Sequence, residues 1–260
     1  MKVAVLLTGH IRSHEETSAS LFRHLLDLYD CDVYCSTWAA NGDKNAREEV
    51  LLRNLHGERL KKIHIEDPKV YNEKKIVYKR EGERDEPVYP RGERKERLDD
   101  GRLFYLKAGV KSSNGIRWVN RLSDQFYLVK QGFNLIRDRY DVVIRIRFDA
   151  LLLQPLRLST GTLTVPYFFG EYHITDHFAY GEMEDMGENC DLHSHMKDLH
   201  EDLGVDISSA EGMMYDYLLQ YCKMPIKVQN FKYKISRPSE GFKSFDVRNT
   251  IDAFPQFGPN

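Results

Sequence analysis

Strands and helices alternate through the first quarter of the chain. Residues 2–7 read as a continuous apolar strand, the kind that is buried on both faces of a parallel sheet. The pattern then predicts a helix over 13–29, a strand over 32–38, a helix near 44–55 and a strand over 60–65. Strands separated by helices in this way run parallel and are joined by right-handed crossovers. We therefore expect an α/β fold in which helices flank a mainly parallel central sheet.

Two signals define the predicted helices. Ser13 and Glu16 have the spacing of a capping box, in which two side chains satisfy free backbone N–H groups at the start of a helix. The strongest helical pattern covers residues 116–139, where apolar side chains recur at steps of three and four. This stripe should pack against the sheet, and it consists of Trp118, Leu122, Phe126, Val129, Phe133 and Ile136.

The segment 140–149 carries the most informative alternation in the chain. Successive strand side chains point to opposite faces, so one face holds Val142, Ile144, Ile146 and Phe148 and the other holds Val143, Arg145, Arg147 and Asp149. Unpaired buried charges cost several kcal/mol unless they meet a ligand, a metal or each other. Arg147 and Asp149 would lie about 6–7 Å apart, close enough to bind one diphosphate and its metal together. The alternative is a plain Arg–Asp pair or a charged face turned to water.

The turn after the first strand is the second candidate site. Thr8, Gly9 and Arg12 lie between a strand and a helix, and ligands of open α/β sheets bind at the carboxyl ends of strands. A single glycine is not a GxGxxG fingerprint, so the signal is general. Trp38 ends the next strand, where it could stack on a base or close the core.

Two carboxylates in the second half of the chain are candidates for acid–base chemistry. Asp176 stands beside two histidines in the aromatic segment 172–181, where it either binds polar substrate groups or is a satisfied core carboxylate. Glu211 opens a predicted helix, and with Ser208 it fits a capping box. Its functional interpretation is a carboxylate held beside the cleft to accept a proton.

Two other polar regions favour simpler interpretations. His193, His195 and His200 lie among acidic residues and read as the solvated face of a helix rather than as a metal site. In the segment 73–100, 18 of 28 residues are charged, nine of each sign, so we expect an exposed loop: either a lid over a substrate or a solvated insertion. Its balanced charge argues against a nucleic-acid arm.

Composition excludes several classes of protein. Lys and Arg number 38 against 40 Asp and Glu, so no overall field attracts nucleic acid or an anionic membrane. The four cysteines are scattered without the spacing of a zinc knuckle. The opening apolar run is too short for a signal peptide or a membrane span. We expect a soluble, cytoplasmic enzyme with one domain over 1–260.

The ordered set of motifs resembles the small glycosyltransferases of GT-A type, including those of large algal (chlorella) viruses and of bacterial surface-polysaccharide clusters. The matching pieces are Val-Ala-Val-Leu-Leu-Thr-Gly-His-Ile-Arg at 3–12, Tyr-Asp-Val-Val-Ile-Arg-Ile-Arg-Phe-Asp at 140–149, Ile-Thr-Asp-His-Phe-Ala-Tyr-Gly at 174–181 and Ala-Glu-Gly at 210–212. The resemblance implies a Rossmann-like GT-A fold. Its nucleotide-binding half would span about 1–150 and its acceptor-binding half about 151–260.

The resemblance also implies a donor and a cation. Enzymes of this type hold a nucleotide-sugar over the carboxyl ends of the first strands, and a UDP-sugar, with UDP-xylose as one example, is the default. An Asp-x-Asp turn binds Mn²⁺ or Mg²⁺ on the diphosphate. Here Arg147-Phe148-Asp149 stands at that position, so the metal would rest on Asp149 alone, and arginine offers a bidentate fork to phosphate.

The mechanism that the resemblance implies is direct displacement with inversion. Glu211 is the first candidate for the base that deprotonates the acceptor hydroxyl, and Asp176 is the second. Arg145 or Arg147 would lie near phosphate. The nucleotide-sugar pocket would be lined by Thr8, Gly9, Arg12 and Trp38.

The partners expected are a nucleotide-sugar donor and a glycan or glycoprotein acceptor, and a homodimer is left open. Two other functions compete with sugar transfer. A sugar nucleotidyltransferase would need a denser phosphate-binding loop than Gly9 supplies. A non-catalytic nucleotide-sugar-binding protein is favoured by the replacement of the first acid by Arg147.

Overall fold

The computed structural model describes residues 1–39, 47–75, 77–80, 103–106, 116–167, 174–203, 205, 209–237 and 241–243. Most of the charged segment 73–100 lies outside these residues, as do His173 and Ser208. The description of Trp118 is limited to its backbone.

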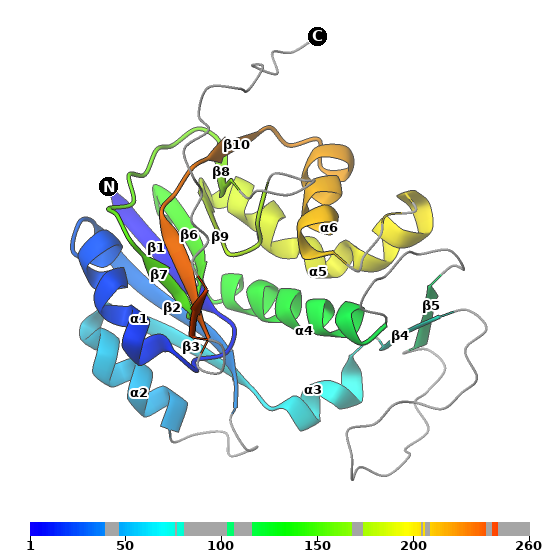
Figure 1. Cartoon of the computed structure of the whole chain (residues 1–260), viewed down its shortest axis with the longest axis horizontal. Helices are drawn as coiled ribbons and strands as arrows, with labels where there is room; N and C mark the ends of the chain where they lie inside the picture. The colour runs from blue at the N-terminus through cyan, green and yellow to red at the C-terminus, as the bar shows by residue number, and fades with distance from the viewer. Residues whose placement is uncertain are drawn as a thin grey trace.

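A seven-stranded sheet with the order β10-β8-β9-β6-β1-β2-β3 forms the centre of the fold (Figure 1). β6, β1, β2 and β3 pair in parallel, whereas β9 runs antiparallel to β6 and to β8. The predicted α/β class and mainly parallel sheet are thus confirmed. The bounds are β1 Lys2–Thr8, β2 Asp30–Trp38, β3 Leu60–Glu66, β6 Val142–Arg147, β8 Leu163–Pro166, β9 Phe178–Gly181 and β10 Ile226–Gln229.

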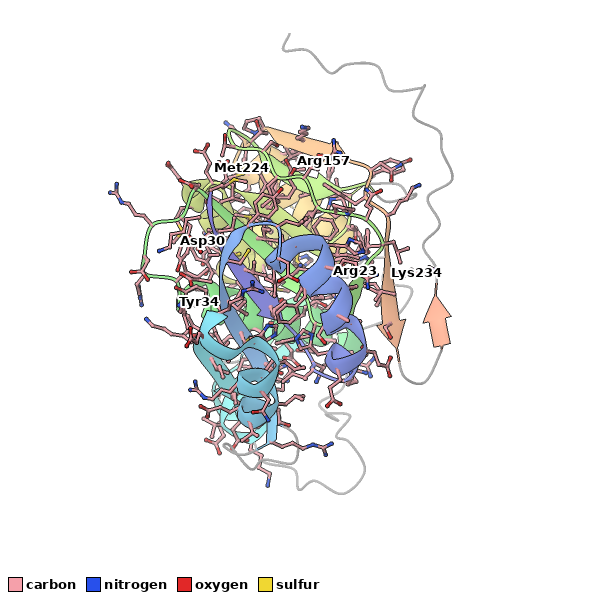
Figure 2. The ribbon with its side chains drawn as sticks, turned by 90° about the vertical axis from the view of Figure 1, so that its left-hand side faces the viewer. Arg23, Asp30, Tyr34, Arg157, Met224 and Lys234 are labelled. Carbon is pink, nitrogen blue, oxygen red and sulfur yellow. The ribbon has the colours of Figure 1, made fainter. Side chains whose placement is uncertain are left out.

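Helices cover both faces of this sheet. The α-helices are α1 His14–Leu21, α2 Arg47–His56, α3 Pro68–Lys74, α4 Ile116–Phe133, α5 Met183–Leu203 and α6 Ala210–Asp216. π-Helical turns extend α1 over Phe22–Leu26 (η1) and α6 over Tyr217–Tyr221 (η5), and a 3-10 turn, η3 Gly57–Arg59, follows α2. Figure 2 shows α1 and α2 in front of the sheet when the molecule is viewed from their side.

Two small sheets complete the fold. β11 Tyr233–Arg237 pairs antiparallel with β7 Ala150–Leu152 and with β12 Gly241–Lys243. β4 Val77–Arg80 pairs with β5 Leu103–Leu106. The sequence of the tail from residue 231 is too irregular to predict β11, because this strand is defined by its pairing with β7 rather than by its own pattern.

The core is divided by the sheet into two layers. Val142, Ile144, Ile146 and Phe148 join the apolar cluster under α1 and α2, while Val143 joins the cluster under α4, α5 and α6. The predicted alternation of β6 is therefore confirmed. It also means that the charged side chains of β6 face the layer of α4, α5 and α6.

A glycine allows α4 to pack closely on the sheet. A Cβ at Gly132 would lie 2.6 Å from Leu6 Cδ1 and 2.8 Å from Ser36 Cβ, which is closer than real contacts allow. Close packing of the helix places its other residues, Asp124 and Gln125 among them, beside the ends of the strands. α4 ends at Phe133 rather than at 139, because the chain turns there to reach β6, although Ile136 stays buried.

The first helix begins where predicted, with Ser13 as its N-cap residue, but the predicted capping hydrogen bond is wrong. The Ser13 side chain makes no capping hydrogen bond to α1; its hydroxyl donates instead to the backbone oxygen of Ser236 at 2.9 Å. Ser236 in turn donates to Glu16 Oε2 at 3.3 Å. Both residues of the expected capping box thus tie α1 to β11. In the described part of the chain, no helix is both long and apolar enough to cross a membrane.

Candidate active site

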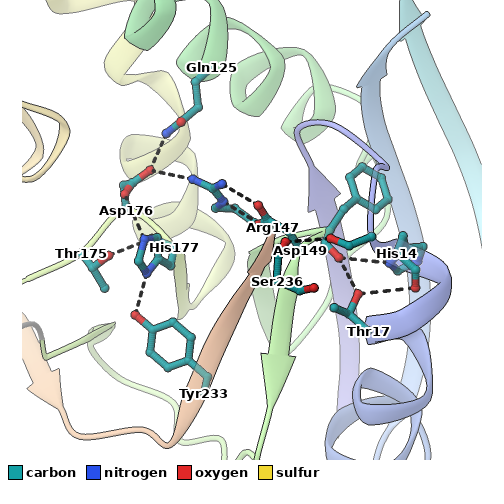
Figure 3. Close-up of polar contacts among 12 residues, drawn as sticks. His14, Thr17, Gln125, Arg147, Asp149, Thr175, Asp176, His177, Tyr233 and Ser236 are labelled. Carbon is teal, nitrogen blue, oxygen red and sulfur yellow. Dashed lines mark hydrogen bonds and ion pairs between the residues drawn. The ribbon is translucent and has the colours of Figure 1, made fainter. Parts of the chain in front are cut away.

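Arg147 and Asp149 form a bidentate ion pair at the end of β6. The distances are 2.8 Å from Nε to Oδ1 and 2.8 Å from Nη2 to Oδ2 (Figure 3). Their side chains remain 21% and 16% exposed, so a ligand could reach them. Burial lowers the pKa of Arg147, but the hydrogen bonds and charge of Asp149 raise it above its ordinary value overall. The two residues that the sequence predicts at one ligand do lie together, and they are paired with each other.

Arg145 is buried, with only 3% of its surface exposed. Its Nε donates to Thr8 Oγ1 at 3.2 Å, and its Nη1 donates to the backbone oxygen of Asp176. Within the described residues, Nη2 has no hydrogen-bond partner. Burial lowers the pKa of this guanidinium. Arg145 therefore joins the end of β1 to the segment before β9, and its contacts are with the protein itself.

Asp176 is a buried anion held by several donors. Its Oδ2 accepts a hydrogen bond from Gln125 Nε2 and lies 3.9 Å from Arg147 Nη1 (Figure 3). Burial raises its pKa, but His177, Arg147 and Arg145 outweigh that effect, and the net pKa is below the usual value. A carboxylate with a lowered pKa and charged partners holds a proton poorly. These contacts therefore fit the interpretation of Asp176 as a core carboxylate better than its role as the catalytic base.

His177 and Tyr233 extend this cluster toward β11. His177 Nδ1 lies 2.8 Å from the Tyr233 hydroxyl, and burial lowers the pKa of His177 to about 4 despite the charge of Asp176. Tyr233 is 3% exposed. Sequence analysis missed this tyrosine, since the tail carries no strand signal that would have placed it near residue 177.

Glu211 is the second residue of α6, and its Oε2 lies 3.5 Å from the hydroxyl of Ser209, which donates a hydrogen bond to it. The N-cap is Ser209, whose Oγ accepts from the Gly212 N–H at 3.1 Å, so the expected cap at Ser208 is wrong by one residue. Burial and the charge of Asp176 raise the pKa of Glu211, while hydrogen bonds from its own backbone N–H and from Ser209, together with the charge of Arg147, oppose the shift. The carboxylate of Glu211 thus belongs electrostatically to the Arg147 and Asp176 cluster, and its raised pKa makes it a stronger proton acceptor than an ordinary glutamate.

A cleft of about 570 Å³ opens beside this cluster, over the carboxyl ends of β1, β2 and β3. Arg12 and Trp38, two of the predicted nucleotide-binding residues, line it, together with His10, Arg47 and Tyr71. Arg145, Arg147, Asp149, Asp176 and Glu211 are not among its described lining residues. His10 connects the two regions, because after burial the charges of Arg12 and Arg147 are the main causes that lower its pKa.

The turn at Gly9 gives the cleft its shape. Gly9 has φ +105°, a conformation that side chains rarely adopt, and its N–H donates to the Ser36 backbone oxygen at 3.1 Å. Thr8, just before it, is 2% exposed, and its hydroxyl accepts a hydrogen bond from Arg145 instead of lining the cleft. The predicted pocket residues thus divide into those that line the cleft and those that support it.

Trp38 both packs and lines the cleft. Its ring lies 5.0 Å from that of Tyr71 and stacks on Tyr127 at 6.1 Å. The two interpretations that the sequence left open, core and base stacking, are therefore compatible with one position.

The described residues do not fit a metal centre held by the protein alone. They contain no group of three His, Cys, Asp or Glu side chains that could ligate a cation. Each carboxylate oxygen of Asp149 accepts one hydrogen bond from Arg147. The cation expected on Asp149 stays a prediction.

The histidines of α5 differ from the predicted solvated face. His200 is 1% exposed, and its Nδ1 lies 3.1 Å from the Val205 backbone oxygen. His193 Nε2 lies 3.4 Å from Ser123 Oγ, and burial lowers its pKa to about 4. His195 is half-buried and stacks on Tyr217. These contacts are structural ones at the interface of α5 with α4 and α6.

No protein-family model matches the chain, and a search of the curated proteins finds no sequence that matches it.

Proposed function

We propose that the protein is a glycosyltransferase that moves a sugar from a nucleoside diphosphate sugar to a hydroxyl of a glycan acceptor. The observation that carries the proposal is the position of the cleft: it opens over the carboxyl ends of β1, β2 and β3 and adjoins a cluster of arginines and carboxylates at the end of β6. Cofactor and nucleotide sites of open α/β sheets lie at this edge.

The cleft has the size for a nucleotide and contains guanidinium groups that could bind its phosphates. Its volume of about 570 Å³ falls within the range of small-molecule sites. Arg12 and Arg47 offer guanidinium groups to a diphosphate, and Trp38 offers a ring to a base. The UDP-sugar that the resemblance implies, such as UDP-xylose, stays a prediction.

In the proposed reaction, the acceptor oxygen forms a bond to the anomeric carbon while the bond from that carbon to the diphosphate oxygen breaks, with inversion. Glu211 accepts the proton of the acceptor hydroxyl, and the electron pair of the breaking bond leaves on the nucleoside diphosphate. Arg147 stabilises the charge on that leaving group by moving one N–H from Asp149 to phosphate. Asp176 positions Arg147, and Arg145 holds the segment before β9.

Replacing Glu211, the proposed catalytic base, distinguishes donor binding from sugar transfer. We expect Glu211→Gln to keep donor binding, measured as a thermal shift, and to lower nucleoside diphosphate release by about 10²–10⁴-fold. Asp216→Asn, on the same helix and bonded to Gln220, is the matched control and should retain wild-type turnover. Unchanged turnover in Glu211→Gln would assign the base elsewhere.

A non-catalytic nucleotide-sugar-binding protein is the second candidate, and the closed Arg147–Asp149 pair favours it, because both oxygens of Asp149 bind Arg147 rather than a cation. Calorimetry would then show binding of nucleotide-sugars with no diphosphate produced from any acceptor, with or without Mn²⁺.

A further inference from the structure

The part of the cleft formed by α3 and α4 differs from the part formed by the turn after β1. The β1 turn contributes His10 and Arg12, which are cationic or polar groups suited to phosphate. α3 and α4 contribute Tyr71, Lys75 and Asp124. β2 lies between β1 and β3 in the sheet, so an elongated ligand would run from the first group of residues to the second.

Asp124 faces this second part of the cleft with a defined set of neighbours. Its Oδ1 lies 3.4 Å from Lys75 Nζ, and the two side chains are 31% and 18% exposed. Lys75 Nζ lies 5.6 Å from the centre of the Tyr71 ring, and that ring lies 5.0 Å from the ring of Trp38. An ammonium group and a carboxylate therefore stand side by side next to two aromatic rings.

On the premise that the cleft takes a nucleoside diphosphate, we propose that its base is guanine, in place of the uracil that the resemblance implies, and that Asp124 and Lys75 recognise the edge of that base. A carboxylate accepts hydrogen bonds only, through two oxygens with about four lone pairs, so the bond to Lys75 leaves capacity for a ligand. Guanine presents two adjacent donors, N1–H and the N2 amino group, next to the acceptor O6. The carboxylate of Asp124 matches the two donors, and the ammonium group of Lys75 matches O6.

The other bases match this pair less well. Uracil has one N–H between two carbonyl oxygens, so the second oxygen of the carboxylate would face an acceptor. Adenine and cytosine each present one amino group beside a ring nitrogen that can only accept. Stacking on Trp38, whose ring is supported from behind by the buried Tyr71, tolerates every base, because each base has a π face. Selectivity for guanine therefore depends on Asp124.

The electrostatics of Asp124 are consistent with a ligand partner. Burial raises the pKa of this carboxyl group, and Lys75 and the Tyr71 hydroxyl offset only part of that shift. N–H donors from a base would add to these contacts, because a carboxylate accepts about four hydrogen bonds.

Calorimetric titration of the full chain with GDP, UDP, ADP and CDP, at one salt concentration, tests the inference. We expect GDP to bind about tenfold or more tightly than each of the others, which is the discrimination that a good bidentate contact provides. Asp124→Asn should remove this preference and favour xanthosine diphosphate over GDP, because xanthine has a carbonyl oxygen where guanine has the amino group, and the asparagine amide can donate to it. Glu15→Gln removes a negative charge elsewhere in the same cleft and should change the affinity for all four nucleotides by the same factor.

The outcomes separate the two proposals. Binding of UDP, ADP or CDP as tightly as GDP would overturn the guanine inference and leave the nucleotide site standing. A GDP preference that survives in Asp124→Asn would show that Asp124 is not the residue that reads the base. Failure of every nucleoside diphosphate to bind would overturn the proposed function itself. If Asp124→Asn fails to fold, the ranking of the four nucleotides on the wild-type protein still decides.

Discussion

The two faces of the central sheet bury polar groups in different ways. On the side of α1 and α2, His14 and His56 form a buried pair with Nε2 atoms 2.9 Å apart, and burial lowers the pKa of each to about 4, so both are neutral at pH 7. On the other side, Arg145 and Asp176 are buried to a similar degree and stay charged. The buried polar groups of the first face are neutral, whereas those of the second face are opposite charges that compensate each other.

This difference separates stability from chemistry. A neutral histidine pair stacked on Phe22 fills the core and leaves little that a ligand could use. The charged face keeps guanidinium and carboxylate groups beside a cleft, where an anion or a proton can be exchanged. Buried charges are maintained only while each retains its partner, so the charged face should be the more fragile of the two.

The largest effect is expected from removing the charge of Asp176. Asp176→Asn retains the size of the side chain and the backbone contact to Arg145, but it leaves two buried guanidinium groups with less compensation. We expect a loss of about 3–5 kcal/mol in the free energy of unfolding, measured by urea denaturation at pH 7. Asp216→Asn is the half-buried counterpart on the same side of the sheet, with its bond to Gln220, and should change stability by less than about 0.5 kcal/mol. Equal effects in the two variants would contradict the dependence of the charged face on the buried charge of Asp176.

A smaller effect should come from the close packing of α4 on the charged face. Gly132→Ala places a Cβ against Leu6 and Ser36, and we expect it to lower the unfolding free energy by about 1–3 kcal/mol. Gly187→Ala is the matched control, since its Cβ would meet Phe133 at 3.5 Å, an ordinary contact, within α5. It should be neutral or stabilise by up to about 1 kcal/mol. Thermal unfolding of both variants decides; a stabilising Gly132→Ala would mean that helix and sheet have room to separate.

The features that the sequence predicts correctly are those with a local period. Apolar side chains at intervals of one or two residues predict the strands 2–7, 32–38 and 60–65 and the two faces of 140–149. This spacing is a local signal, because each buried face of a strand requires apolar residues. The same period places Arg147 and Asp149 on one face, and the structure joins them directly. The choice between a shared ligand and mutual pairing depends on side-chain rotation, which no pattern encodes.

Features that depend on distant segments are not predictable in this way. Ser13 has the spacing of a cap but binds Ser236, which is remote in sequence and lies in a strand without a signal of its own. Tyr233, which lies in the same strand as Ser236, likewise contacts His177, a residue remote in sequence. At α6 the consecutive serines 208 and 209 each allow a cap, and only the position of the helix decides that Ser209 is used.

The smallest effect concerns the neutral face and its pH dependence. A histidine whose pKa is lower in the folded protein than in the unfolded chain, about 4 against about 6.5, destabilises the fold as it becomes acidic, because the unfolded chain binds the proton first. The full stability is present above pH 6.5 and declines between pH 6.5 and 4. We expect His56→Phe, which keeps a ring against Phe22, to reduce that decline by about 1.4 kcal/mol per pH unit in urea titrations from pH 7.5 to 4.5. Phe22→Leu alters the stacking without removing a titratable group, so it should leave the slope unchanged. Identical slopes in His56→Phe and the wild type would show that His56 binds its proton as readily in the folded protein as in the unfolded chain, and the contrast with the Arg145 and Asp176 face would then disappear.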